Sequence, residues 1–144
     1  MNDYAGSCHC GALAVCFSTR LSPETLLVRA CQCSFCRKHD ARAVSDPEGR
    51  MEILVREPDQ LQRYGFALGE TEFLLCRRCG VYVAAYMPDG DAAYANVMVN
   101  VLDDRLRFGE PQPLVLDGED GAGKRQRRRA NWTPARLREE QAGD

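Results

Sequence analysis

The sequence predicts an all-β protein whose small domain is built around bound metal. Its apolar residues come in short runs with a period of two, which is typical of strands that bury one face. Glycine, proline and aspartate stand between these runs and indicate tight turns. Seven of the eight cysteines fall into three close groups, and metal bound by such groups contributes directly to the stability of a small domain.

The candidate strands follow one another with short connections. The first covers residues 12–19, where Leu13, Val15 and Phe17 share one face. Further strands are expected at residues 25–30, 51–55, 61–64, 72–75, 81–86 and 93–101. No long helical period interrupts them before residue 116. Short strands joined by turns predict two small antiparallel sheets.

The composition changes near residue 116, which divides the chain into a zinc-binding domain at residues 1–116 and a charged tail at residues 117–144. The tail contains a basic run at residues 124–129, and it counts seven basic against six acidic residues. This near balance argues against nucleic acid as a partner. Thr133 before Pro134 is typical of a helix start, so we expect a short C-terminal helix over residues 134–140.

The overall composition is that of a globular protein in the cytoplasm. Apolar residues make up 44% and charged residues 28% of the sequence, and the longest apolar stretches are too short to cross a bilayer. No N-terminal segment has the charged start and apolar run of a signal peptide. We therefore expect a cytoplasmic protein without a membrane partner, in which grouped cysteines bind metal rather than form disulfides. The formal net charge of −2 indicates no particular partner or oligomeric state.

The spacing of the cysteines predicts two zinc ions. The three groups are Cys8 and Cys10; Cys31, Cys33 and Cys36; and Cys76 and Cys79. The two pairs together complete a closed four-thiolate site, which leaves three thiolates and one vacant position for a second zinc, as in catalytic sites. A closed second site with His39 or His9 as its fourth ligand is the alternative. Cys16 stands outside the groups, and we expect it to be a buried, inert thiol.

Three thiolates around zinc favour thiol chemistry over hydroxide formation. Such a site carries a net negative charge, so it is a weaker Lewis acid than zinc bound by three neutral histidines. A thiol that binds there loses its proton near neutral pH, and we hypothesise that its sulfur attacks an aldehyde carbonyl. His39 is then a candidate general acid or base, and Arg37 and Lys38 are candidates for binding the thiol's carboxylates. The alternative for all three is a solvated loop.

Three motifs resemble those of one known family. They are Gly6-Ser7-Cys8-His9-Cys10-Gly11, Cys31-x-Cys33-Ser34-x-Cys36-Arg37-Lys38 and Cys76-x-x-Cys79-Gly80. In this order, and over residues 6–101, the sequence is similar to the glutathione-dependent formaldehyde-activating enzyme family, which also includes centromere protein V. The resemblance implies a zinc-bearing β-tent of two sheets. It also implies a structural zinc on the two cysteine pairs and a catalytic zinc on the triplet.

The activity that this resemblance implies is the making and breaking of carbon–sulfur bonds, in which glutathione and formaldehyde combine to S-hydroxymethylglutathione. We therefore predict a zinc-dependent carbon–sulfur lyase that acts on a thiol–aldehyde adduct, with glutathione or another small thiol as cosubstrate. The partners are then a small thiol and an aldehyde. The alternatives are a non-catalytic zinc module that binds protein or nucleic acid, and a thiol carrier.

Overall fold

The computed structural model describes residues 1–66, 70–114 and 121–140, and it confirms the prediction of a mostly β protein. The strands are β1 (Asn2–Ser7), β2 (Leu13–Thr19), β3 (Arg29–Cys31), β4 (Ala43–Val44), β5 (Arg50–Val55), β6 (Leu61–Tyr64), β7 (Glu72–Cys76), β8 (Tyr82–Asp89), β9 (Ala92–Met98), β10 (Gln112–Leu114) and β11 (Thr133–Glu139). The helices are α1 (Ser34–His39), α2 (Gly121–Asn131) and three short 3-10 helices at Pro58–Gln60, Val99–Val101 and Arg105–Arg107. In these described ranges, none of the helices has the length and apolar character needed to span a membrane.

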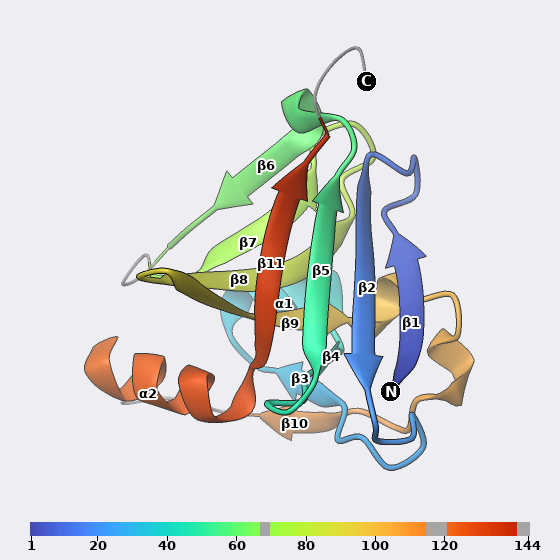
Figure 1. Cartoon of the computed structure of the whole chain (residues 1–144), viewed down its shortest axis with the longest axis vertical. Helices are drawn as coiled ribbons and strands as arrows, with labels where there is room; N and C mark the ends of the chain where they lie inside the picture. Colours follow the sequence, from blue (N-terminus) through green and yellow to red (C-terminus); the bar gives the residue numbers. More distant parts are fainter. Residues whose placement is uncertain (67–69, 115–120, 141–144) are drawn as a thin grey trace.

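The strands belong to one hydrogen-bonded sheet, which corrects the expected separation into two antiparallel sheets. The main path runs in the order β1-β2-β5-β11-β9-β4-β3-β10, and β8 connects β7 and β6 to β9. Figure 1 shows β1, β2, β5 and β11 side by side, with β8 and β9 crossing them. The two layers are joined because β11 pairs in parallel with β5 over residues 135–139 and pairs with β9 at its first two residues.

The C-terminal segment is a strand and not the expected helix over residues 134–140. Its side chains alternate: Ala135 and Leu137 pack against the core, whereas Arg136 and Arg138 are exposed. This period of two, together with the hydrogen bonds to β5, outweighs the helix-start signal at Thr133. The C-terminal helix is α2, which lies earlier in the chain and covers the basic run.

A buried polar corner fixes the start of β11. Asp46 is only 5% exposed, and Thr19 and Thr133 are fully buried. The Thr19 hydroxyl donates to the Asp46 carboxylate at 2.6 Å, and the Asp46 amide donates to the Thr133 hydroxyl oxygen at 2.8 Å. Because these buried polar groups satisfy one another, the loop after β4 and the end of β2 hold the first residue of β11 in place.

Two apolar clusters form the core. The larger lies against the layer of β1, β2, β5 and β11 and contains Leu13, Val15 and Phe17, which share one buried face as the alternation predicts. The smaller contains Cys36 from α1 and Trp132 from the link between α2 and β11. The smaller cluster therefore joins the cysteine triplet to the C-terminal segment.

Gly6 has no room for a side chain, because an isolated β-bridge joins it to Leu102 and a Cβ would overlap the carbonyl oxygen of Val101. We expect Gly6→Ala to lower the free energy of unfolding by about 1–3 kcal/mol in urea denaturation. The control is Gly109→Ala, since a Cβ there meets no described atom within 4 Å. Equal stability of the two variants would contradict the close approach at Gly6.

Candidate functional site

Four cysteines from two distant turns meet in one cluster. Cys8 and Cys10 lie in the turn between β1 and β2, Cys76 ends β7, and Cys79 lies in the turn before β8. Their four Sγ atoms all lie within 4.8 Å of one another, and the sulfurs of Cys10 and Cys76 are 3.5 Å apart. Sulfur atoms so arranged fit the tetrahedral coordination of zinc by four thiolates.

The two turns have a common local geometry. Each contains a glycine with positive φ, 84° at Gly11 and 79° at Gly80, a conformation that disfavours other residues. The amide of Leu13 donates to the Cys8 sulfur at 3.3 Å. The two turns therefore direct the cysteine sulfurs toward one another, and backbone amides donate hydrogen bonds to these sulfurs.

The charge at this cluster needs a compensating cation. Burial raises the pKa of the Cys8 thiol to about 12, so without added positive charge this thiol stays neutral. One cation is already present: the Arg78 guanidinium lies 3.9 Å from the Cys10 sulfur and is held by two 2.8 Å hydrogen bonds to Glu57. A bound zinc would supply the rest, and the donor set fits it.

The second cluster surrounds the start of α1. Cys31 ends β3, Cys33 caps α1, and Cys36 lies in its first turn. Their three Sγ atoms also lie within 4.8 Å of one another, and the Cys33 sulfur accepts from the Cys36 amide at 3.4 Å. The division into a group of four and a group of three matches the one expected from spacing; that the groups bind zinc stays a prediction.

The thiols of the triplet titrate as a unit. The hydrogen bond from the Cys36 thiol lowers the pKa of Cys31 to about 5, and the same contact, together with burial, raises the pKa of Cys36. Cys31 therefore carries negative charge most readily. Tyr82 lies beside them, and burial raises the pKa of its hydroxyl well above the usual range. Tyr82 thus remains protonated and able to donate a hydrogen bond.

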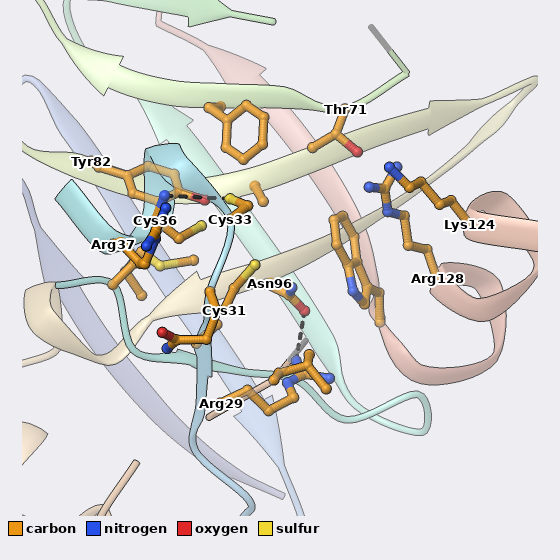
Figure 2. A pocket seen from close by; sticks show the side chains of 18 of the residues that line it. Arg29, Cys31, Cys33, Cys36, Arg37, Thr71, Tyr82, Asn96, Lys124 and Arg128 are labelled. Carbon is orange, nitrogen blue, oxygen red and sulfur yellow. Dashed lines mark hydrogen bonds between the residues drawn. The ribbon is translucent and has the colours of Figure 1, made fainter. Parts of the chain in front are cut away.

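The triplet opens onto a cavity of about 590 Å³, a size typical of small-molecule sites. Phe66 and Phe73 contribute aromatic surface to its lining, and Trp132 contributes part of the wall. Figure 2 shows the cysteine sulfurs on one side of the cavity and the side chains of Lys124 and Arg128 on the other. The cavity therefore combines sulfur, aromatic and basic surfaces.

The basic run lies at this cavity, which is not expected for a segment predicted to be a charged tail. Its residues Lys124, Arg127 and Arg128, all in α2, line the cavity. Their spacing of three and four residues, which puts side chains on one face of a helix, is the signal that could have found them.

The candidate residues of α1 are placed differently from one another. Arg37 lines the cavity, whereas Lys38 and His39 are exposed and do not belong to its described lining. The ring of His39 packs on Phe35, with centroids 4.5 Å apart. In the described part of the chain neither His39 nor His9 joins the triplet of sulfurs.

Cys16 lies in β2 outside both described cysteine groups, and it is half-buried rather than buried as expected. Burial raises the pKa of its thiol, and the negative charge of Asp3 adds to the effect. A thiol with a raised pKa forms little of the reactive thiolate, which agrees with an inert role.

Comparison with known proteins adds to this description. A crystal structure of a protein from Rhodobacter sphaeroides is 28% identical to this chain, covers 76% of it and 99% of its own length, and superposes with a TM-score of 0.56. The family described as glutathione-dependent formaldehyde-activating enzyme matches residues 3–115, which include both cysteine clusters but not α2 or β11. Since this match spans more than half of the sequence, the chain belongs to the glutathione-dependent formaldehyde-activating enzyme family.

Proposed function

We propose that the protein is a zinc-dependent carbon–sulfur lyase that makes or breaks an adduct of a small thiol and an aldehyde, such as S-hydroxymethylglutathione. The observation that carries this proposal is the position of the triplet: three sulfurs within 4.8 Å of one another line a cavity of about 590 Å³. The family description names glutathione and formaldehyde, which makes them the first candidates for the two reactants.

In the forward direction the thiol sulfur bonds to the carbonyl carbon, and the carbonyl oxygen takes up the proton that the thiol has lost. The reverse direction breaks the same carbon–sulfur bond and returns the proton to sulfur. Zinc bound by Cys31, Cys33 and Cys36 would supply an open coordination position, and direct binding of the reacting thiol to the metal there would favour its thiolate form.

The residues around the triplet support this chemistry. The buried hydroxyl of Tyr82 is a donor next to the sulfurs, and an aldehyde oxygen that becomes negative is stabilised by such a donor. Phe73 and Phe66 add apolar surface to the cavity, which would limit the access of water to the reacting atoms. Arg37 remains a candidate for a carboxylate of the thiol. The role of His39 as an acid or base stays a prediction.

The four-cysteine cluster is proposed as the structural zinc site. It joins the β1–β2 turn to the β7–β8 turn, and its residues do not belong to the described lining of the cavity. Two zinc ions per chain are therefore expected, one for the fold and one for the chemistry.

Cobalt substitution tests the vacancy at the triplet. We expect two equivalents of cobalt per chain and a change in the visible absorption spectrum when glutathione is added, because a further sulfur would enter the coordination of one metal. Two closed sites whose spectrum does not respond to glutathione or other small thiols would contradict the lyase and favour a non-catalytic zinc module.

Serine substitutions separate the two metal roles. We expect Cys79→Ser to lose one zinc equivalent and at least about 3 kcal/mol of the free energy of unfolding, since a structural zinc contributes folding free energy directly. Cys33→Ser should lose thiol binding but keep the fold, because serine still caps α1. Zinc content and urea denaturation are the measurements, with Cys16→Ser as the control. Global unfolding of Cys33→Ser would make the triplet structural.

A further inference from the structure

The helix α2 presents a basic face to the cavity. Lys124, Arg127 and Arg128 stand three and four residues apart, so they share one side of the helix, and all three line the cavity. This helix lies outside residues 3–115, which the family match covers. The basic face is therefore a feature of this chain that the family match does not describe.

Contacts from another side of α2 hold the helix at the cavity. Arg129 makes hydrogen bonds of 2.6 and 3.0 Å to the Asp89 carboxylate at the end of β8, and Arg125 pairs with Glu70. The Ser45 hydroxyl donates to the last carbonyl of the helix, at Asn131, at 2.7 Å. The basic run thus divides by helical period into cations that anchor the helix and cations that line the cavity.

A further cation comes from β3. The Arg29 guanidinium donates to the hydroxyl of Ser45 at 2.7 Å and to the side-chain oxygen of Asn96 at 2.9 Å. Both acceptors are neutral, and no described carboxylate pairs with Arg29. Arg127 is near enough for its positive charge to act on both Arg29 and Cys31. Arg29 therefore adds a cation from β3 to the wall that α2 lines.

Among the described residues of the lining, basic side chains outnumber carboxylates. Its described residues include five basic side chains and one carboxylate, that of Glu70, which already pairs with Arg125. The basic side chains are Arg29, Arg37, Lys124, Arg127 and Arg128. Arg127 and Arg128 also interact elsewhere in the chain, so the excess that favours a ligand of negative charge rests on Arg29 and Lys124.

A buried hydroxyl, that of Thr71, also indicates a polar ligand in the cavity. Thr71 lines the cavity, is only 5% exposed, and its Oγ1 has no hydrogen-bond partner among the described residues. Figure 2 shows Thr71 on the wall near Lys124. Buried polar groups without a partner are rare in native proteins, so a ligand that accepts a hydrogen bond here would satisfy this hydroxyl.

We propose that Arg29, Lys124 and Arg127 bind an oxyanion, a carboxylate or phosphate group, that belongs to the substrate thiol. The Thr71 hydroxyl is a further donor to the same ligand. This inference rests on the proposed function, because it assigns the charged end of a thiol whose sulfur approaches the triplet. Hydrogen bonds between guanidinium groups and oxyanions are strong and directional, so they would fix the orientation of the thiol.

Calorimetry on the zinc-loaded full chain tests the assignment with two thiols of similar size, mercaptopropionate and mercaptoethanol. We expect the acid to bind about tenfold or more tightly than the alcohol, since a charge-assisted hydrogen bond supplies that difference. Lys124→Gln combined with Arg127→Gln should reduce the preference to about twofold. Arg127→Lys, which keeps the charge, should retain most of it. Equal affinity of the wild-type protein for the two thiols would overturn the proposal.

The control is Arg105→Gln, an exposed arginine outside the described lining, which should leave the preference unchanged. An equal loss in this variant would mean that net charge and not the site is responsible, and this also overturns the proposal. Circular dichroism and zinc content show whether α2 and the metal sites are retained in the double variant. If the double variant loses α2 or its zinc, the proposal is tested by the comparison of the two thiols in the wild-type protein alone.

Acetate and inorganic phosphate, as competitors without sulfur, identify the oxyanion. Displacement of mercaptopropionate by acetate at lower concentration than phosphate assigns a carboxylate, and the reverse order assigns a phosphate; displacement by neither overturns the site. These anions also separate the two proposals. If neither thiol binds but an anion binds in a manner that depends on Lys124 and Arg127, the lyase fails and the oxyanion site stands.

Discussion

The arrangement of the molecule depends on the pairing of β11 with two strands at once. One part of β11 extends the layer of β1, β2 and β5, and its first two residues pair with β9 of the crossing layer. The buried hydrogen bonds among Thr19, Asp46 and Thr133 hold it at that junction. Because α2 ends immediately before this fixed point, the helix must lie beside the crossing layer, where the cavity is. The pairing of a C-terminal strand therefore determines what faces the cysteine triplet.

The features that sequence predicted well are those with a local cause. Cysteines two or three residues apart point to a common centre because a single turn aims them, so both sulfur clusters could be anticipated from spacing. Strand alternation worked in the same way for Leu13, Val15 and Phe17, since period and burial are linked within one segment. The secondary structure of residues 134–140, in contrast, does not have a local cause. Thr133 and Pro134 serve equally well before a helix or at a strand start, and only the distant partners β5 and β9 decide between them.

His39 and the basic run of α2 also make contacts that their sequence patterns do not predict. His39 follows Cys36 at a distance that permits it to be a ligand, but it ends α1 and its ring packs on Phe35, four residues earlier. The basic run of α2 is expected from sequence to be balanced by acidic residues of the same tail. In the described part of the chain, Arg125 and Arg129 of this run pair with Glu70 and Asp89, which belong to the central part of the chain. In both cases the contact partner cannot be inferred from the spacing of the cysteines or from the charge balance of the tail.

The electrostatics of the cavity follow from placing these parts together. Three thiolates with a bound zinc would leave a net negative charge, which would repel a thiol that itself carries an anionic group. The cations of β3 and α2 line another part of the same cavity and would attract such an anionic group. A ligand with a sulfur at one end and an oxyanion at the other could interact with both the cysteine triplet and these cations. A neutral thiol could interact only with the triplet. Attachment at two points also restricts the directions from which the sulfur can meet an aldehyde, which lowers the entropic cost of the bond-forming step. The helix α2, which lies beyond the family match, would in this way select the thiol, and the cysteine triplet would carry out the proposed carbon–sulfur chemistry.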